Sequence, residues 1–198
     1  MNNYRKIAGA LLTIVLAVPA AASAKTYKVD PDHTTVAFRI RHLFSYVEGR
    51  FKQFEGRIEF DPKTPEKTRV QGSILVASID TGVPERDKHL RSKDFFDVEK
   101  YPRITFESTR VSDIDPKAMK AKLHGKLTIH GVTRDVVLDV AFLGEGKDPW
   151  GNTKAGFTAR GKINRKDFGL GWNEVLETGG LLVGEEVELR VDAEGAAE

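Results

Sequence analysis

The chain has 198 residues, no cysteine, and 31 basic against 29 acidic side chains, which gives a formal net charge of +2. The lack of cysteine excludes disulfides, thiolate metal sites and thiol nucleophiles. The near balance of charge argues against a surface built to bind nucleic acid or an anionic membrane.

The first 24 residues have the pattern of a cleavable signal peptide. Arg5 and Lys6 make a positive start, residues 7–18 are apolar, and residues 22–24 form a small-x-small cleavage site. The apolar stretch is shorter than the roughly 20 residues that span hydrocarbon, which disfavours an uncleaved anchor. We expect a mature chain that begins at Lys25. The leader indicates export, and the lack of repeats or adhesin-like tracts favours the periplasm over secretion.

After the leader, eight segments alternate apolar and polar residues, which is the period of half-buried β-strands. The first segment, residues 36–42, has its apolar face on even-numbered positions, and His42 continues that face. The second, residues 48–60, changes parity between Phe51 and Phe54, which predicts a bulge. The other six strands are predicted at residues 69–79, 103–108, 122–129, 135–142, 154–163 and 186–191.

One helix is predicted between the third and fourth strands, at residues 84–93. Pro84 suits its first turn, and acidic residues at its start with basic ones near its end complement the helix dipole. Two interpretations of the run from Arg86 to Arg91 are open: it binds an anionic head group, or it is a solvated face held by ion pairs four residues apart. Those pairs would be Glu85 with His89 and Asp87 with Arg91.

Three further segments complete the expected organisation. Phe95 and Phe96, directly after the helix, are expected to plug one end of the fold, and residues 165–184 to form a loop or short helix at its mouth. His130-Gly131 lies between two alternating runs as a tight hairpin turn. The short connections predict antiparallel neighbours.

Residues 25–198 are therefore predicted to form a single all-β domain, an eight-stranded antiparallel β-barrel with one short helix. Closure would remove exposed strand edges, and a two-sheet sandwich is the competing solution. A barrel of this size is either filled by its own side chains or able to hold one small ligand.

The predicted inner face favours an apolar cavity because it contains several small residues. These residues leave space, although in a tapering barrel they can also pair with large neighbours. They are Gly72, Ser108, Gly125, Ala155, Ala159 and Gly161.

A lining of this composition favours a long hydrocarbon guest, because each buried methylene contributes roughly 0.8 kcal/mol. Within it, His42 has two open interpretations: it donates a hydrogen bond to an oxygen of the guest's head group, or it is a core histidine with a partner inside the protein. The residues predicted to bind the ligand are Phe38, Ile40, His42, Phe51, Ile58, Phe106, Leu127, Leu138, Phe142 and Phe157.

Several motifs, in order along residues 25–198, resemble the YceI-like polyisoprenoid-binding family. They are Phe38-Arg39-Ile40-Arg41-His42, Glu85-Arg86-Asp87-Lys88-His89-Leu90-Arg91-Ser92 with Asp94-Phe95-Phe96, Tyr101-Pro102, Thr105-Phe106, residues 125–133, and Asp148-Pro149-Trp150-Gly151. The resemblance implies a lipocalin-like barrel carrying a helix, with an isoprenoid lipid such as a ubiquinone or polyprenyl phosphate inside. It also implies periplasmic export.

Catalytic and metal-binding motifs are missing from the sequence, which predicts a binding protein and not an enzyme. His33, His124 and His130 lack the spacing of a metal site, so no metal and no cofactor are expected. Two other functions remain open: a lipid hydrolase or isomerase with His42 as acid or base, and a stress-response or surface-interaction protein with a solid barrel. The expected partner is an isoprenoid lipid, bound by a monomer or homodimer without stable insertion into a membrane.

Overall fold

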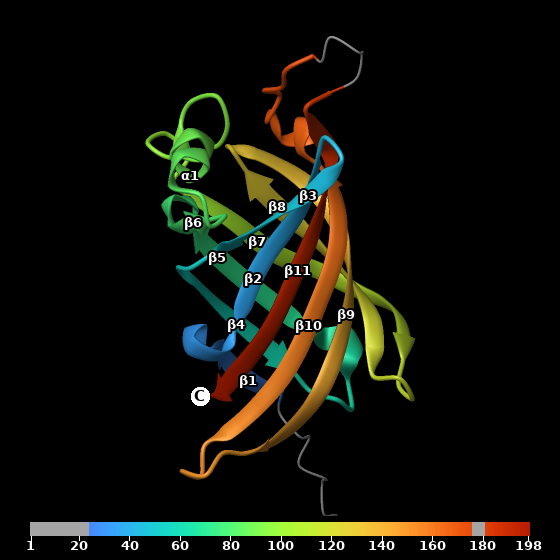
Figure 1. The fold of residues 1–198 in the computed structure, drawn as a ribbon. Helices are drawn as coiled ribbons and strands as arrows, with labels where there is room; N and C mark the ends of the chain where they lie inside the picture. Colours follow the sequence, from blue (N-terminus) through green and yellow to red (C-terminus); the bar gives the residue numbers. More distant parts are fainter. Residues whose placement is uncertain (1–23, 176–180) are drawn as a thin grey trace, which may run out of the picture.

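The computed structural model describes residues 24–175 and 181–198, which form a closed antiparallel β-barrel (Figure 1). The predicted signal peptide, up to residue 23, and residues 176–180 of the predicted mouth segment lie outside the described residues. The strands are β1 (Lys25–Val29), β2 (Thr35–His42), β3 (Ser45–Phe51), β4 (Phe54–Phe60), β5 (Arg69–Leu75), β6 (Ile79–Asp80), β7 (Arg103–Asp115), β8 (Lys120–Ile129), β9 (Val132–Lys147), β10 (Thr153–Asn164) and β11 (Val183–Ala197). The helical elements are α1 (Pro84–Arg91) and the 3-10 turns η1 (Pro31–His33), η2 (Pro65–Lys67), η3 (Val76–Ser78) and η4 (Arg165–Phe168).

The described strands make eight barrel positions because six of them join end to end in pairs. β1 and β2 follow one another along β11, β3 and β4 pair with β2 and β1 respectively, and β6 and β5 pair with β3 and β4. From β5 onward each strand pairs with the next long strand in the chain, and β11 returns to β1 and β2 to close the ring. The predicted eight-stranded antiparallel barrel with one helix is confirmed.

The predicted single strand at residues 48–60 is wrong in detail, because the structure breaks it at Lys52 and Gln53. The ladder is replaced there by bonds to a matching break in the neighbouring strand. The amide of Lys52 donates to the carbonyl of Ser78 (3.2 Å), and the amide of Gln53 donates to the Ser78 hydroxyl (3.0 Å). The parity change between Phe51 and Phe54 therefore marks a break that two adjacent strands share. Strand β1, where Tyr27 is only 1 % exposed, was not predicted.

The predicted helix is confirmed and ends at Arg91, two residues early. Its predicted ion pair between Asp87 and Arg91 is wrong. The Asp87 carboxylate accepts from the amide (2.9 Å) and hydroxyl (2.6 Å) of Thr81, and Arg91 donates to the carbonyl of Ala77 (3.1 Å). These bonds hold α1 against the segment around β6, at one end of the barrel (Figure 1).

The buried core is divided into two clusters, and neither fills the whole barrel. One lies toward the end with α1, and the other lies toward the end with the C-terminus (Figure 1). The first cluster contains Phe51, Val76, Ile79, Ile104, Leu127, Ile129, Phe168 and Leu170, and the second contains Tyr27, Ile58, Phe60 and Ala155. The middle of the barrel therefore depends on partly buried side chains that face one another across a space.

The small residues of the inner face contribute unequally to this space. A Cβ on Gly125 would lie 2.4 Å from the ring of Phe106, and one on Gly161 would lie 2.5 Å from Leu138. Both glycines thus accommodate a large neighbour, as in a tapering barrel. A Cβ on Gly72 would meet no atom closer than the carbonyl oxygen of Glu55, at 3.8 Å.

These two environments predict different effects of the same substitution. We expect Gly125→Ala to lower the free energy of unfolding by about 1–3 kcal/mol, because the added Cβ would overlap Phe106. Gly72→Ala is the matched control and is expected to leave that free energy unchanged or raise it by up to about 1 kcal/mol. Urea denaturation followed by circular dichroism measures both, and equal losses would contradict the described packing.

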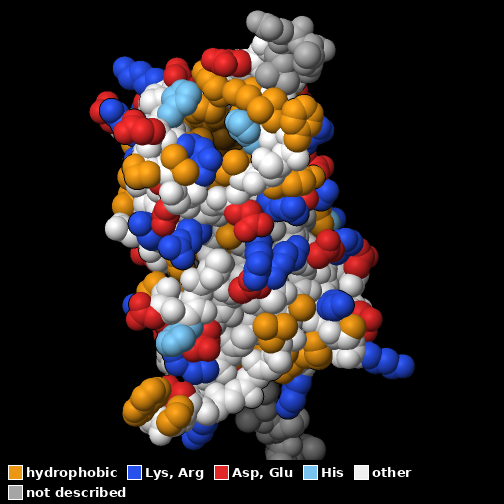
Figure 2. Space-filling model, viewed as in Figure 1, with side chains coloured by type: hydrophobic (Ala, Val, Ile, Leu, Met, Phe, Trp, Pro, Cys, Tyr) orange, Lys and Arg blue, Asp and Glu red, His pale blue; other side chains and the backbone are white. Residues whose placement is uncertain are grey.

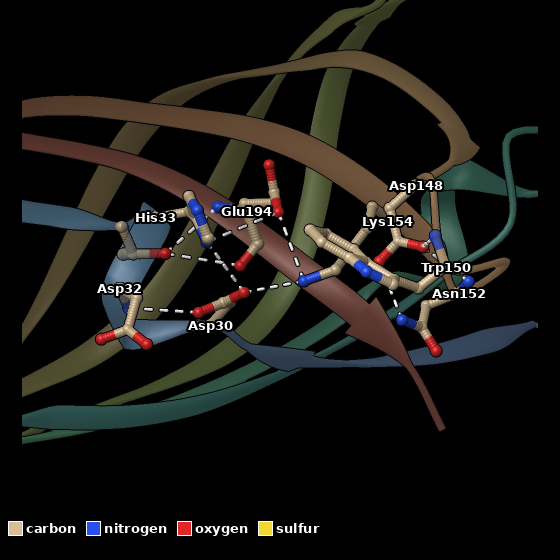
Figure 3. Close-up of polar contacts among 9 residues, drawn as sticks. Asp30, Asp32, His33, Asp148, Trp150, Asn152, Lys154 and Glu194 are labelled. Carbon is tan, nitrogen blue, oxygen red and sulfur yellow. Dashed lines mark hydrogen bonds and ion pairs between the residues drawn. The ribbon is translucent and has the colours of Figure 1, made fainter.

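A polar cluster on the outside of the barrel ties the junction of β1 and β2 to β10 and β11 (Figure 3). Asp30 lies between a ring nitrogen of His33 (3.1 Å) and the ammonium of Lys154 (2.7 Å), and Lys154 also reaches Glu194 (3.3 Å). The bond from Lys154 is the main cause that lowers the pKa of Asp30 to about 2, and the Asp30 carboxylate raises the pKa of His33. The cluster therefore fixes the turn η1 against the last strand.

We predict that His33 titrates above its ordinary pKa of 6.5 and that Asp30→Asn brings its midpoint down. The asparagine retains the oxygen that caps η1 by accepting from the Asp32 amide, so the fold should persist. Because the folded-state pKa is raised, the contribution of His33 to stability is complete below 6.5 and is lost as pH rises through the folded-state pKa. An NMR titration of the His33 ring measures this, and an unchanged midpoint in the variant would sink the assignment.

Candidate functional site

A cavity of about 770 Å³ occupies the interior between the two core clusters. This volume equals about 25 groups the size of a water molecule, at roughly 30 Å³ each. Its wall is mainly apolar and takes side chains from β1 to β5 and from β7 to β11. Figure 2 shows a hollow with a hydrophobic wall at the end of the molecule that carries α1. The barrel thus encloses a long apolar space.

All ten side chains predicted to bind a ligand lie on the wall of this cavity. The alternation of polarity placed them there because one face of every barrel strand points inward. Phe60, Phe142 and Phe157 pack together near the C-terminal end, with ring centroids 4.8–5.5 Å apart. The ten residues are Phe38, Ile40, His42, Phe51, Ile58, Phe106, Leu127, Leu138, Phe142 and Phe157.

The end with α1 forms a mouth, defined here by His42, His89, Phe95, Arg165 and Trp172, all on the cavity wall. Three of their rings meet edge to face or tilted: His89 lies 4.9 Å from Trp172 and 5.1 Å from Phe95, and Phe95 lies 5.0 Å from Trp172. Trp172 thereby connects α1 to the segment that follows η4. Phe95, as part of a plug, and the segment that contains Trp172 were both predicted at a barrel end.

The charged run of α1 fits each of its two interpretations, head-group binding and a solvated face, only in part. Arg86 and His89 border the cavity, whereas Lys88 is exposed. The predicted pair between Glu85 and His89 is wrong, since the His89 ring bonds to the carboxylate of Asp94 at 2.9 Å. One side of the helix therefore faces the mouth and another faces solvent.

Arg165, which was not predicted as a site residue, is the most buried charged group of the cavity wall, at 3 % exposure. Its Nε donates to the carbonyl of Gly184 (2.8 Å), and its Nη1 donates to the carbonyls of Leu170 and Trp172. Burial lowers the pKa of Arg165. A signal for it was present, because Arg165 continues the odd-numbered inward face of β10 after Ile163. Arg165 was instead assigned to the predicted loop or short helix at residues 165–184, because it follows the last apolar residue of that strand.

His42 lies half-buried on the cavity wall, and in residues 24–175 and 181–198 neither of its ring nitrogens has a hydrogen-bond partner. Its interpretation as a core histidine with an internal partner is therefore wrong. An acid–base role would require a nucleophile or carboxylate bonded to the ring, and the described part of the chain supplies none at His42. Its polar edge is free to contact a guest.

One cluster of side chains outside the cavity has the composition of a possible metal site. Ligand atoms of Asp30, His33 and Glu194 lie within 4.8 Å of one another, a grouping that histidine spacing alone did not reveal. The ammonium of Lys154 already bonds both of these carboxylates (Figure 3), so a cation is present in that cluster as a side chain.

Among the helices of the described residues, none is long and apolar enough to cross a bilayer.

The sequence and the fold both have relatives. Residues 27–195 match the YceI-like domain. The YceI protein of Salmonella arizonae is 41 % identical over 194 residues, which cover 96 % of this chain and 97 % of that protein.

Two solved structures share the fold. The crystal structure of Burkholderia cenocepacia BcnA superposes with a TM-score of 0.74 at 28 % identity, covering 84 % of this chain and 98 % of that one. A polyisoprenoid binding domain from Saccharophagus degradans, implicated in plant cell wall breakdown, shares the fold with a TM-score of 0.61 at 16 % identity, covering 89 % of this chain and all of that one. Since the matched segment spans nearly the whole barrel and the identity to the Salmonella protein is high, the chain belongs to the YceI-like domain family.

Proposed function

We propose that this protein is a periplasmic carrier that holds the chain of an isoprenoid lipid, such as a ubiquinone or a polyprenyl phosphate, inside its barrel. The proposal rests on one observation, the apolar cavity of about 770 Å³ between two separate core clusters. An unfilled apolar space of this size would forfeit dispersion contacts along its whole wall, and a hydrocarbon guest restores them. The site is therefore suited to binding and storage of a long hydrocarbon chain.

The energetics favour a long chain over a small solute. At roughly 0.8 kcal/mol per buried methylene, about ten methylene groups supply the roughly 8 kcal/mol of micromolar affinity. Additional groups offset the ordering of a flexible chain, which the cavity volume accommodates. The aromatic and branched side chains of the wall offer broad contact surfaces and few hydrogen-bonding groups, so the chain contributes more to affinity than the head group.

The relatives and the leader support the two remaining parts of the proposal. The Saccharophagus degradans domain with this fold is described as polyisoprenoid binding, which is the ligand class that this cavity fits. The leader-like residues 1–24 support export, and a lipid in an aqueous compartment needs a shielded carrier because its chain is insoluble there. Transport, storage and a role in the stress response are all compatible with such a carrier.

The competing functions fit the geometry less well. A solid barrel would need one continuous core packed to the density of protein interiors, and the divided core does not have it. A lipid hydrolase would need His42 to share a hydrogen bond with a nucleophile, and its ring has no such bond within the described residues. Binding without turnover is therefore the function that the site supports best.

We predict that a large residue at position 72 closes the cavity without destabilising the barrel. Gly72→Phe should reduce the amount of chain lipid that co-purifies with the protein at least tenfold, as measured by mass spectrometry of an organic extract, because the ring enters the cavity. Its free energy of unfolding should fall by no more than about 1 kcal/mol, since a Cβ there meets nothing within 3.4 Å. Gly72→Ala is the control with lipid retained. A barrel packed solid would instead yield a lipid-free wild type and an unfolded Gly72→Phe variant.

A second prediction uses the two tryptophans of the sequence. Trp150 is 84 % exposed, whereas Trp172 borders the cavity mouth. In a Trp150→Phe variant the remaining emission should therefore change on addition of geranylgeraniol and saturate with its concentration. A Trp172→Phe variant, which retains Trp150, should bind the same alcohol without that change. Emission from Trp172 that is indifferent to the alcohol would argue against entry of the chain at this mouth.

A further inference from the structure

The guanidinium of Arg165 is held rigidly and is incompletely used. Its Nε and Nη1 donate to three backbone carbonyls, which belong to Leu170, Trp172 and Gly184. Its Nη2 has less than 1 Å² of exposed surface and no hydrogen-bond partner among the described residues. A buried charged donor without a partner is strongly unfavourable, so the unused end of this side chain requires an explanation.

The guanidinium of Arg165 also forms no salt bridge with a carboxylate of the described residues. The nearby carboxylate is Glu185, which bonds to the ammonium of Lys166 at 2.6 Å and forms no ion pair with Arg165. Within the described part of the chain, the groups that bond directly to Arg165 are carbonyl oxygens, which supply dipoles, whereas the charge of Glu185 acts on it without direct contact. A buried cation of this kind favours an anion that brings both a charge and a lone pair.

A break in the barrel ladder explains how Arg165 comes to lie at the cavity. The pairing of β11 with β2 is irregular between Val183 and Val187, so the carbonyl of Gly184 is available to the Nε of Arg165. Within the same irregular stretch, Val183 pairs with His42. Arg165 and His42 are therefore attached to two consecutive residues of β11, and both border the cavity at its mouth.

We propose that Arg165 and His42 form a head-group subsite that binds an oxyanion, such as a phosphate, at the end of an isoprenoid chain held in the cavity. This inference rests on the proposed function and narrows it to lipids with an anionic head. The phosphate oxygens accept hydrogen bonds from Nη2 of Arg165 and from the ring of His42. The isoprenoid chain runs from there toward the core cluster that contains Tyr27 and Phe60. Because Nη2 is closed off, the neighbouring side chains of the mouth shift when the head group enters.

An anionic head is favoured over a neutral carbonyl for an electrostatic reason. A quinone carbonyl would satisfy the hydrogen bond of Nη2 without bringing a negative charge into contact with the guanidinium, whereas a phosphate provides the hydrogen bond and the charge. The mouth also carries Arg86, whose guanidinium bonds to the hydroxyl and carbonyl of Thr81, both at 2.8 Å. Its charge adds to the positive potential, and its Nε and Nη2 are engaged with Thr81. We therefore assign recognition to the unpartnered, buried Nη2 of Arg165.

The test compares two ligands that have the same chain and different heads, geranylgeranyl phosphate and geranylgeraniol, bound to the full protein after removal of endogenous lipid. The wild type should bind the phosphate about tenfold tighter or more, the effect of one charge-assisted hydrogen bond. Arg165→Gln should abolish this preference and leave the affinity for the alcohol within about twofold, since the chain contacts are unchanged. His42→Gln should reduce the preference by a smaller factor. Lys166→Gln, which removes the neighbouring charge outside the cavity, should leave the preference intact.

Each remaining outcome decides against one part of the proposal. Equal binding of the two ligands by the wild type overturns the oxyanion subsite and leaves the carrier function standing, and it does so even if Arg165→Gln does not fold. A preference that persists in a folded Arg165→Gln variant, checked by circular dichroism, overturns the role of Arg165. Failure of the wild type to bind either ligand overturns the proposed function itself.

Discussion

Strand β11 pairs with β10 along one edge and with both β1 and β2 along the other, and this pairing closes the barrel. Without it, two strand edges would carry unpaired backbone groups, and the inner apolar face would open to water. Closure also sets the diameter, because an eight-stranded barrel has an interior that is only just wide enough for side chains or one small ligand. Where the core clusters end, that diameter leaves the space in which a chain can lie.

The cavity arises from how large and small side chains are distributed along the barrel. Phe106 covers Gly125 and Leu138 covers Gly161, so these pairs fold large groups back toward the wall and away from the axis. Bulky residues concentrate in the two clusters, where rings such as those of Phe60 and Phe142 contact each other directly. The wall between the clusters is formed by partly buried side chains such as Leu138 and Val140. The barrel is thus stabilised at its two ends and is open between them.

Much of this was predictable from the sequence because a strand has a period of two residues. Alternation placed His42 and Phe157 on the inner face. The helix was identified separately, by its charge distribution and by Pro84 at its start. Features that depend on contacts between distant segments were not predictable. The break at Lys52 is stabilised by Ser78. The alternation of β10 indicated that Arg165 points inward, but the three backbone carbonyls that hold its guanidinium come from residues that no local pattern identifies. The small residues were correctly placed on the inner face, but only Gly72 and Ala159 border the cavity, because filling depends on which side chains oppose each other.

Closure of the barrel by β11 determines when the binding site forms during folding. The cavity wall draws on strands from both ends of the chain, including Val29 of β1 and Ala193 of β11, so no part of the chain contains the binding site by itself. These contacts are separated by most of the sequence, and such non-local pairings form late in folding. A guest can therefore enter only after synthesis and folding are complete, and once inside it adds its binding free energy to the stability of the entire domain.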